Sequence, residues 1–195
     1  MRSPYDIEVL KTKLDCKKLE EIILKKETEI IKKYSPFGDG GTGLGLNSLT
    51  SRFNSFNVLK WSGTKSLANA IKNGYEQYNS IKDKSIYVKC WANVMRKGQK
   101  ISPHHHSFGN ILPEHYLCGT LIVKTDGSTS SFYDKNKSIK NHNGDINLFQ
   151  SHVVHSTNPY VGDSERISIN FDIYSQDYLI NAVPWEKRDY CFVKL

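Results

Sequence analysis

The sequence predicts a mainly β protein, a sandwich or barrel preceded by two supporting α-helices. In two segments before residue 82, apolar residues recur with helical spacing. After residue 82 the spacing changes to the two-residue alternation of strands. The later segments are short and divided by Gly, Asn, Asp and Pro turn residues, which favours a sandwich or barrel.

The two predicted helices are amphipathic. The first spans residues 14–33, and its apolar residues near one face are Leu19, Ile22, Ile23 and Ile30. The second spans residues 65–79, and its apolar residues at i, i+4, i+8 and i+11 are Leu67, Ile71, Tyr75 and Tyr78. We expect both helices to pack against a larger body.

The predicted strands are rich in β-branched and aromatic residues. They span residues 86–95, 117–124, 130–134, 145–150 and 165–174. The chain of 195 residues is long enough for a sizeable core, and no linker interrupts it. We therefore expect one domain over 1–195, with 1–82 as mostly helical support and 83–195 as the β core.

A glycine-rich segment, PFGDGGTGLGLNS at 36–48, follows the first predicted helix. It lacks the Lys-Ser/Thr ending of a phosphate-binding P-loop and does not lie between a clear strand and helix. We expect a structural loop with several positive-φ positions.

The charge is unevenly spread. The net charge is +7, and residues 1–100 hold 19 Lys+Arg against 10 Asp+Glu. This basic half fits either a nucleic-acid footprint or a solvated lysine-rich helix face. The second interpretation is favoured because no arginine-rich patch alternates with aromatic residues.

The sequence shows neither a membrane-spanning segment nor a secretory signal. No apolar run approaches the roughly 18 residues that span a bilayer, and residues 1–10 lack the apolar region of a secretory signal. The four cysteines are scattered without a zinc-binding spacing, as is typical of thiols in a reducing compartment. A cytoplasmic protein without a membrane partner is expected.

All seven histidines lie between positions 104 and 155. His104 and His106 are two apart in a segment expected to be extended, so their imidazoles point to the same side. A jelly roll can bring His155, from a distant strand, alongside them. Imidazole suits Zn, Cu, Fe and Ni. The pattern favours a metal site over an incidental surface histidine run.

Residues 166–173, RISINFDI, alternate between two faces. The apolar face carries Ile167, Ile169, Phe171 and Ile173, and the polar face carries Arg166, Ser168, Asn170 and Asp172. A strand packed on one side places its polar face in water. In a sandwich with a cavity, the polar face can line that cavity instead.

Arg166 gains significance from its place after His155. If the two strands form a hairpin, Arg166 returns close to that histidine. A guanidinium there can clamp a carboxylate with two parallel hydrogen bonds, and an α-keto acid is the organic anion that uses both a metal and an arginine. Ser168 can add a hydroxyl donor. The alternative is that Arg166 is a solvated turn residue.

Five stretches, taken together and in order, resemble the 2-oxoglutarate/Fe(II) oxygenases related to prolyl hydroxylases that are common in bacteriophages and marine bacteria. They are WANVMRKG (91–98), PHHH (103–106), CGTLIV (118–123), LFQSHVVH (148–155) and ERISINF (165–171). The resemblance implies a double-stranded β-helix (jelly roll), with Fe(II), 2-oxoglutarate and O2 as cofactors and co-substrates.

The resemblance also implies roles for particular residues. His104 and His155 would ligate iron, Arg166 would bind the distal carboxylate of 2-oxoglutarate, and Asn93 would contact the co-substrate or support the site. The wider superfamily has a carboxylate two residues after the first histidine. Here that residue is His106, which we expect as the third ligand, as in the smaller family. Gln150 also departs from the family's usual proline.

The expected activity is therefore a hydroxylase-like dioxygenase acting on a peptidyl residue or a small molecule. Three other functions stay open. The spacing from Gly98 to the histidines matches half of a cupin motif, which fits a metal dioxygenase that does not use 2-oxoglutarate. A non-catalytic metal-bound jelly roll and a nucleic-acid binder are the others.

Overall fold

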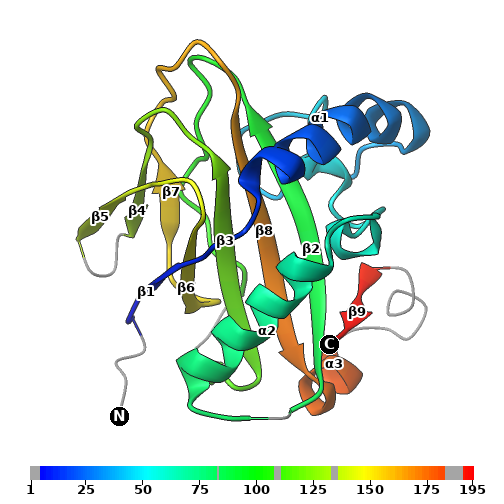
Figure 1. The fold of residues 1–195 in the computed structure, drawn as a ribbon, viewed down its shortest axis with the longest axis vertical. Coiled ribbons are helices and arrows are strands. Elements are labelled where there is room, and N and C mark those ends of the chain that lie inside the picture. The colour runs from blue at the N-terminus through cyan, green and yellow to red at the C-terminus, as the bar shows by residue number, and fades with distance from the viewer. Residues whose placement is uncertain (1–4, 83, 108–110, 133–135, 183–190) are drawn as a thin grey trace.

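A computed structural model describes residues 5–82, 84–107, 111–132, 136–182 and 191–195 (Figure 1). The elements in chain order are β1 (Glu8–Lys11), α1 (Cys16–Lys33), η1 (Thr50–Arg52), η2 (Val58–Lys60), α2 (Lys65–Asn79), β2 (Ile86–Met95), β3 (Tyr116–Lys124), β4 (Thr129–Phe132), β5 (Lys137–Lys140), β6 (Asp145–Gln150), β7 (His155–Thr157), β8 (Arg166–Ser175), α3 (Gln176–Ala182) and β9 (Val193–Lys194).

The strands form two antiparallel sheets. One has six strands in the order β1-β6-β3-β8-β2-β9, and the other has three in the order β5-β4-β7. Strands far apart in sequence are neighbours, since β8 pairs with both β2 and β3, and β1 pairs with β6. This is a mainly β jelly roll with supporting helices, which confirms the predicted fold class.

Local sequence sets the ends of the two long helices. The Asp15 carboxylate accepts a hydrogen bond from the Lys18 backbone N–H, so it caps the start of α1, which ends where Tyr34 turns extended. At the end of α2, Ser80 adopts a left-handed conformation with φ of 54° and its N–H binds the last carbonyls. The predicted bounds of α2 are confirmed, and α1 begins two residues later than predicted.

Both helices cover one face of the six-stranded sheet, on the viewer's side in Figure 1. One buried apolar cluster joins them to the sheet. Its members include Leu19, Ile23, Ile30, Leu67, Ile71, Tyr75, Tyr78, Ile167, Ile169, Phe171 and Ile173. The apolar faces predicted for the helices and for residues 166–173 therefore pack against one another. Ile22 is only partly buried.

The opposite face of β8 is polar and also buried. Arg166 and Ser168 are each 1% exposed, Asp172 is 5% and Asn170 is 9%. Residues of the second, three-stranded sheet line a narrow cavity together with Arg166, Ser168 and Asn170, whereas Asp172 borders a wider one. The polar face is therefore buried rather than in water, and the solvated-turn interpretation of Arg166 is wrong.

The strands of His155 and Arg166 do not form the hairpin that the sequence left open. β7 pairs with β4 in the small sheet, whereas β8 lies between β3 and β2 in the large one. The connection between them crosses from sheet to sheet and is anchored by Tyr160, whose N–H donates to Gln99 and whose carbonyl accepts from Gly98. His155 and Arg166 consequently face each other across the sandwich.

The glycine-rich loop is ordered by its own carboxylate. Gly40, Gly41, Gly43 and Gly45 all have positive φ. The Asp39 side chain accepts hydrogen bonds from the backbone N–H groups of Gly41 (3.1 Å) and Gly45 (3.0 Å). The Thr42 carbonyl accepts from the Ser102 N–H at 2.7 Å. The expected structural loop is confirmed, and it is attached to the segment that leads to His104.

Among the described residues, no helix has both the length and the apolar character needed to cross a membrane. No disulfide joins any of the four cysteines, all of which lie in described residues.

Candidate metal centre

Two backbone segments bring three histidines together. His104 and His155 form an antiparallel bridge, with the His104 N–H donating to the His155 carbonyl at 3.1 Å and the reverse bond at 2.9 Å. Two residues further on, the His106 N–H donates to the Ser151 carbonyl at 2.8 Å. One ring nitrogen of each histidine lies within 4.8 Å of the others. The three imidazoles can therefore bind one ion.

Each ring is oriented by an acceptor at Nδ1. The acceptor is the Ser102 carbonyl for His104 (2.9 Å), the Val153 carbonyl for His155 (2.9 Å) and the Asp172 carboxylate for His106 (2.6 Å). Carbonyl and carboxylate oxygens only accept hydrogen bonds, so Nδ1 carries the proton in all three rings. Nε2 is thereby left with a lone pair for a metal.

Burial keeps two of these rings neutral. It lowers the pKa of His104 to about 4, with a further contribution from His106. Burial also holds the pKa of His155 well below its usual range, again helped by the neighbouring histidines. Neutral imidazole is the metal-binding form, so these rings are ready to bind an ion at physiological pH.

A narrow inner cavity of about 40 Å3 extends from the histidines between the two sheets. Its wall includes His104, His106 and His155 at one end, with Arg166, Ser168 and Asn93 also lining it. The Asn93 side chain accepts a hydrogen bond from the Thr50 hydroxyl. The predicted site residues therefore surround one cavity.

Arg166 is a buried cation that forms no ion pair with any residue in the described part of the chain. Its Nε donates to the Ser128 hydroxyl at 2.8 Å, and one terminal nitrogen lies 3.3 Å from the Met95 sulfur. No carboxylate of the described residues is within ion-pair distance of it. Burial lowers its pKa to about 10. Because a buried charge is costly unless it is paired, this cavity is suited to an anion.

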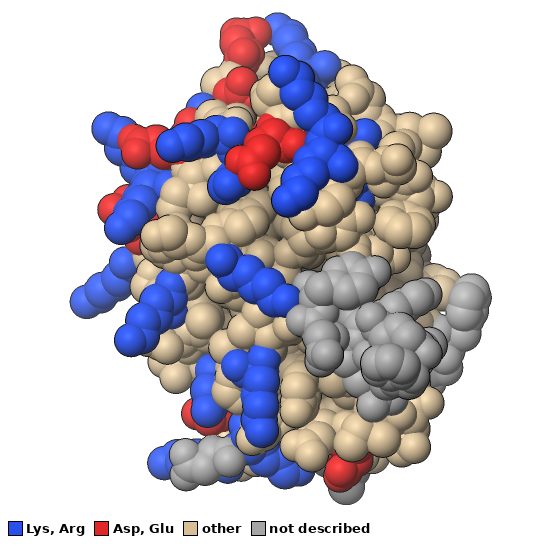
Figure 2. Space-filling model, turned by 90° about the vertical axis from the view of Figure 1, so that its right-hand side faces the viewer, with Lys and Arg blue, Asp and Glu red and all other residues tan. Residues whose placement is uncertain are grey.

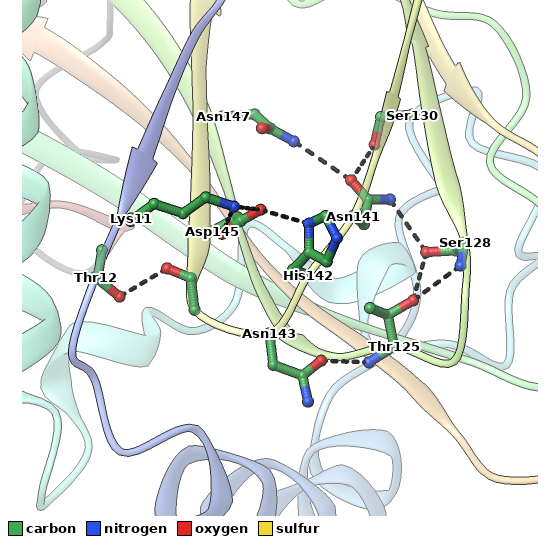
Figure 3. Close-up of polar contacts among 11 residues, drawn as sticks. Lys11, Thr12, Thr125, Ser128, Ser130, Asn141, His142, Asn143, Asp145 and Asn147 are labelled. Carbon is green, nitrogen blue, oxygen red and sulfur yellow. Dashed lines mark hydrogen bonds and ion pairs between the residues drawn. The ribbon is translucent and has the colours of Figure 1, made fainter.

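A polar network holds the serine that orients Arg166. Ser128 accepts a hydrogen bond from the Asn141 amide at 3.1 Å and shares another with the Thr125 hydroxyl at 2.6 Å (Figure 3). Asn141 in turn binds Ser130 and Asn147, so the network ties β4 to β6. Arg166 is thus held in place by side chains of both sheets.

Two further buried polar atoms in the cavity have no hydrogen-bond partner in the part of the chain that the structure describes. They are Nδ2 of Asn170 and Oδ1 of Asn147. The other amide atom of Asn170 is occupied, because its Oδ1 accepts from the Thr120 hydroxyl at 3.0 Å. Buried polar groups are normally satisfied, so these atoms indicate a polar ligand in the cavity.

A second, wider cavity of about 240 Å3 lies on the other side of the histidines. Thr42, Trp91, His104 and His106 belong to the walls of both cavities. Its wall combines the aromatic side chains of Phe53, Trp91, Tyr116 and Tyr174 with the charged side chains of Asp39, Lys89 and Asp172. The histidines therefore border both a narrow cavity and a wider one.

The sequence patterns led to the histidines, Arg166, Ser168 and Asn93, but not to the residues that support them. Asp172 is on the same alternating face as Arg166, and that alternation alone was a signal of its inward direction. Ser128 gave no signal, because its contact with Arg166 joins side chains 38 residues apart, one directly before β4 of the small sheet and one on β8 of the large sheet.

No family model matches the chain, and no curated protein matches it in sequence.

The solved structures that are similar over most of the chain include the following three. The viral collagen prolyl hydroxylase of Paramecium Bursaria Chlorella virus-1, in complex with 2OG, has a TM-score of 0.55 at 15% identity, covering 87% of this chain and 96% of that one. A Pseudomonas putida prolyl-4-hydroxylase has 0.52 at 13%, covering 88% and 94%. The non-heme alpha ketoglutarate dependent carbocyclase SnoK from nogalamycin biosynthesis has 0.59 at 13%, covering 98% and 92%. The chain therefore has the jelly-roll fold of 2-oxoglutarate-dependent non-haem iron oxygenases, the group that its motifs resemble.

Proposed function

We propose that this protein is a 2-oxoglutarate- and Fe(II)-dependent dioxygenase that hydroxylates its prime substrate. The proposal rests on Arg166, a buried guanidinium that has no anionic partner among the described residues and lines the same cavity as three convergent imidazoles. A metal at the histidines and a carboxylate at the arginine together match the two ends of an α-keto diacid.

The donor atoms fit the proposed metal. Three Nε2 atoms on one side of an ion leave its other side for a chelating co-substrate and for O2, and imidazole is a ligand that iron accepts. The narrow inner cavity suits a slender chain, and the unpaired Asn170 amide adds a donor along its path.

In this proposal His104, His106 and His155 hold the iron, and Arg166 holds the far carboxylate of 2-oxoglutarate with a fork of two hydrogen bonds. Ser168 and Asn93, which line the cavity, would contact the co-substrate between its iron-chelating end and its far carboxylate. When bound, iron and 2-oxoglutarate would supply oxidation in which 2-oxoglutarate, O2 and R–H give succinate, CO2 and R–OH. The protein positions both molecules and excludes water.

The outer cavity is the proposed site of the prime substrate. Its volume of about 240 Å3 admits one side chain or a small molecule, and Trp91, Phe53 and Tyr116 give it an apolar wall against which a C–H bond can be placed near the histidines. A peptidyl residue or a small molecule fits this space. We place the protein in the cytoplasm on the basis of its scattered cysteine pattern, which is typical of thiols in a reducing compartment.

One observation favours a second candidate. His106 stands where a carboxylate ligand would complete the usual triad, and a set of three histidines also serves dioxygenases of the cupin type. Such an enzyme needs neither 2-oxoglutarate nor Arg166. The two candidates therefore differ in whether 2-oxoglutarate binds.

An anaerobic titration with Fe(II) and 2-oxoglutarate tests the proposal. The wild type should develop the visible charge-transfer band of iron chelated by an α-keto acid. His104→Ala and His155→Ala should abolish the band, because each removes one of three ligands. His142→Ala is the matched control, since that exposed ring pairs with Asp145 outside the site.

Iron binding without the band, together with O2 consumption that does not depend on 2-oxoglutarate, would establish the cupin-type alternative. Metal binding without any turnover would point to a structural metal site.

A further inference from the structure

We propose that Asp172 is a positioning residue that acts through His106 and gives the iron site the negative charge that its three neutral ligands lack. The inference rests on the proposed function, because it assumes iron at the histidines. It assigns a role to a residue that is not itself a ligand and that sequence patterns did not single out as part of the site.

The carboxylate is fixed at both oxygens. Oδ1 of Asp172 lies 2.6 Å from Nδ1 of His106 and also accepts a hydrogen bond from the Cys118 thiol, with a distance of 3.2 Å between sulfur and oxygen. Oδ2 lies 3.5 Å from the Tyr174 hydroxyl. The Asp172 and His106 side chains are 8% and 10% exposed. A carboxylate held in this way keeps one orientation toward the ring.

The three histidines are not equivalent in this respect. His104 and His155 donate Nδ1–H to backbone carbonyls, which are neutral. Only His106 donates to an ionised group. A carboxylate behind a metal-binding imidazole raises the basicity of the ligating nitrogen, and removing such a partner typically weakens metal affinity 10–100-fold. His106 should therefore be the strongest donor of the three.

The overall charge leads to the same conclusion. Three neutral imidazoles leave Fe(II) with its full charge of +2, whereas a triad with one carboxylate ligand leaves +1. Asp172 restores the missing negative charge one hydrogen bond further away, in a buried site where electrostatic interactions are stronger than in water.

Direct ligation by Asp172 is a different arrangement. His106, Cys118 and Asp172 also have donor atoms within 4.8 Å of one another. However, Asp172 occupies Nδ1 of His106, while Nε2 is on the opposite side of the ring. One ion cannot be bound by Nε2 of His106 and by this carboxylate in the observed geometry, so Asp172 acts behind the ligand.

The test compares Asp172→Asn with Asp145→Asn. Asparagine can still accept the bond from His106 but has no charge. Asp145 is a matched control, because it is also a buried aspartate in contact with a histidine Nδ1, that of His142 at 3.2 Å, and lies outside the triad (Figure 3).

We expect Asp172→Asn to lower Fe(II) affinity about 10–100-fold and to raise the Fe(III)/Fe(II) midpoint potential, since a nearby negative charge stabilises Fe(III) more than Fe(II). Asp145→Asn should change neither. Asp172→Glu, which keeps the charge, should recover part of the loss. In a His106→Ala background, Asp172→Asn should have no further effect on affinity.

The outcomes separate the two proposals. If the wild type binds Fe(II) and 2-oxoglutarate but Asp172→Asn leaves affinity and potential unchanged, this inference is overturned and the proposed function stands. If the wild type binds no iron, both are overturned. If the wild type binds two ions and Asp172→Asn loses one of them while the other stays at the three histidines, Asp172 is a ligand of another site and the inference is wrong.

If Asp172→Asn fails to fold, the inference can be tested on the wild-type protein instead. In the Zn(II)-loaded protein, the Nδ1 protons of the three ligands can be compared by NMR. A proton shared with a carboxylate should resonate further downfield than those donated to carbonyls. Three equivalent resonances would overturn the inference.

Discussion

At the scale of single residues, Arg166 separates an oxygenase of the proposed class from a bare metal site. Losing one partner of a buried charge pair costs about 2–5 kcal/mol. We therefore expect Arg166→Ala to raise the 2-oxoglutarate concentration required roughly 30-fold or more, with Fe(II) affinity nearly unchanged. Arg166→Lys should recover part of the loss, because an ammonium replaces the charge but not the fork. Calorimetric titration of both ligands measures this.

Arg96→Ala is a suitable control for Arg166→Ala. Its side chain is 55% exposed and pairs with Glu27 outside the cavity, so 2-oxoglutarate affinity should not change. If Arg166→Ala binds 2-oxoglutarate as the wild type does, the co-substrate assignment is wrong and the cupin-type function should replace it.

At the scale of elements, Gly119 shows how closely the side chains of β6 and β8 pack over the strand β3 between them. A Cβ at this position would lie 2.3 Å from a ring carbon of Phe171 and 2.8 Å from a methyl of Leu148. Overpacking of a core typically costs about 1–3 kcal/mol. We expect Gly119→Ala to lower the free energy of unfolding by about that amount in urea denaturation.

Phe171→Leu in the Gly119→Ala background should recover part of this loss, because the smaller side chain removes the ring that the new methyl would meet. Additive destabilisation by the two substitutions would show that the clash is absorbed elsewhere.

Long elements could be predicted from the sequence because each contains several periods of its pattern. The bounds of α2, β2 and β6 agree with prediction, β3 begins one residue earlier than predicted, and β8 is shifted by one residue at both ends. The strand predicted at 130–134 is observed as Thr129–Phe132, and residues 133 and 134 lie outside the described residues. The helix α3 and the strands β1, β5, β7 and β9 were missed, since the missed strands have only two to four residues.

The site was predictable to the extent that it depends on local spacing. His104 and His106 share a side because they are two apart, and Arg166 faces inward because its strand alternates. The supporting contacts could not be predicted in this way. Asp172 meets His106 across 66 residues and Ser128 meets Arg166 across 38, so both depend on how the strands are ordered in space.

At the scale of the whole molecule, the basic charge is dispersed. Figure 2 shows lysine and arginine side chains spread over one face, with acidic side chains among those at its upper end. Arg96 pairs with Glu27, and Lys124 pairs with Glu20. We expect binding to DNA or RNA to be no tighter than non-specific, with micromolar or weaker dissociation constants at physiological salt and a steep salt dependence.

Fluorescence anisotropy with labelled duplex and single-stranded oligonucleotides at two salt concentrations checks this expectation. A tight complex that depends on sequence at physiological salt would contradict it and would make a nucleic acid the leading prime substrate.

The pairing of β1 with β6 has a consequence for aggregation. All six residues of β6 are buried, whereas β1, at the end of the strand order, is partly exposed and carries Glu8 and Lys11. Charged residues on a short edge strand discourage pairing with another chain. A chain without residues 1–11 would present the β6 backbone as a new, apolar edge, and such an edge promotes self-association between copies. The first strand thus protects the sheet during storage and handling at high concentration, independently of any part in catalysis.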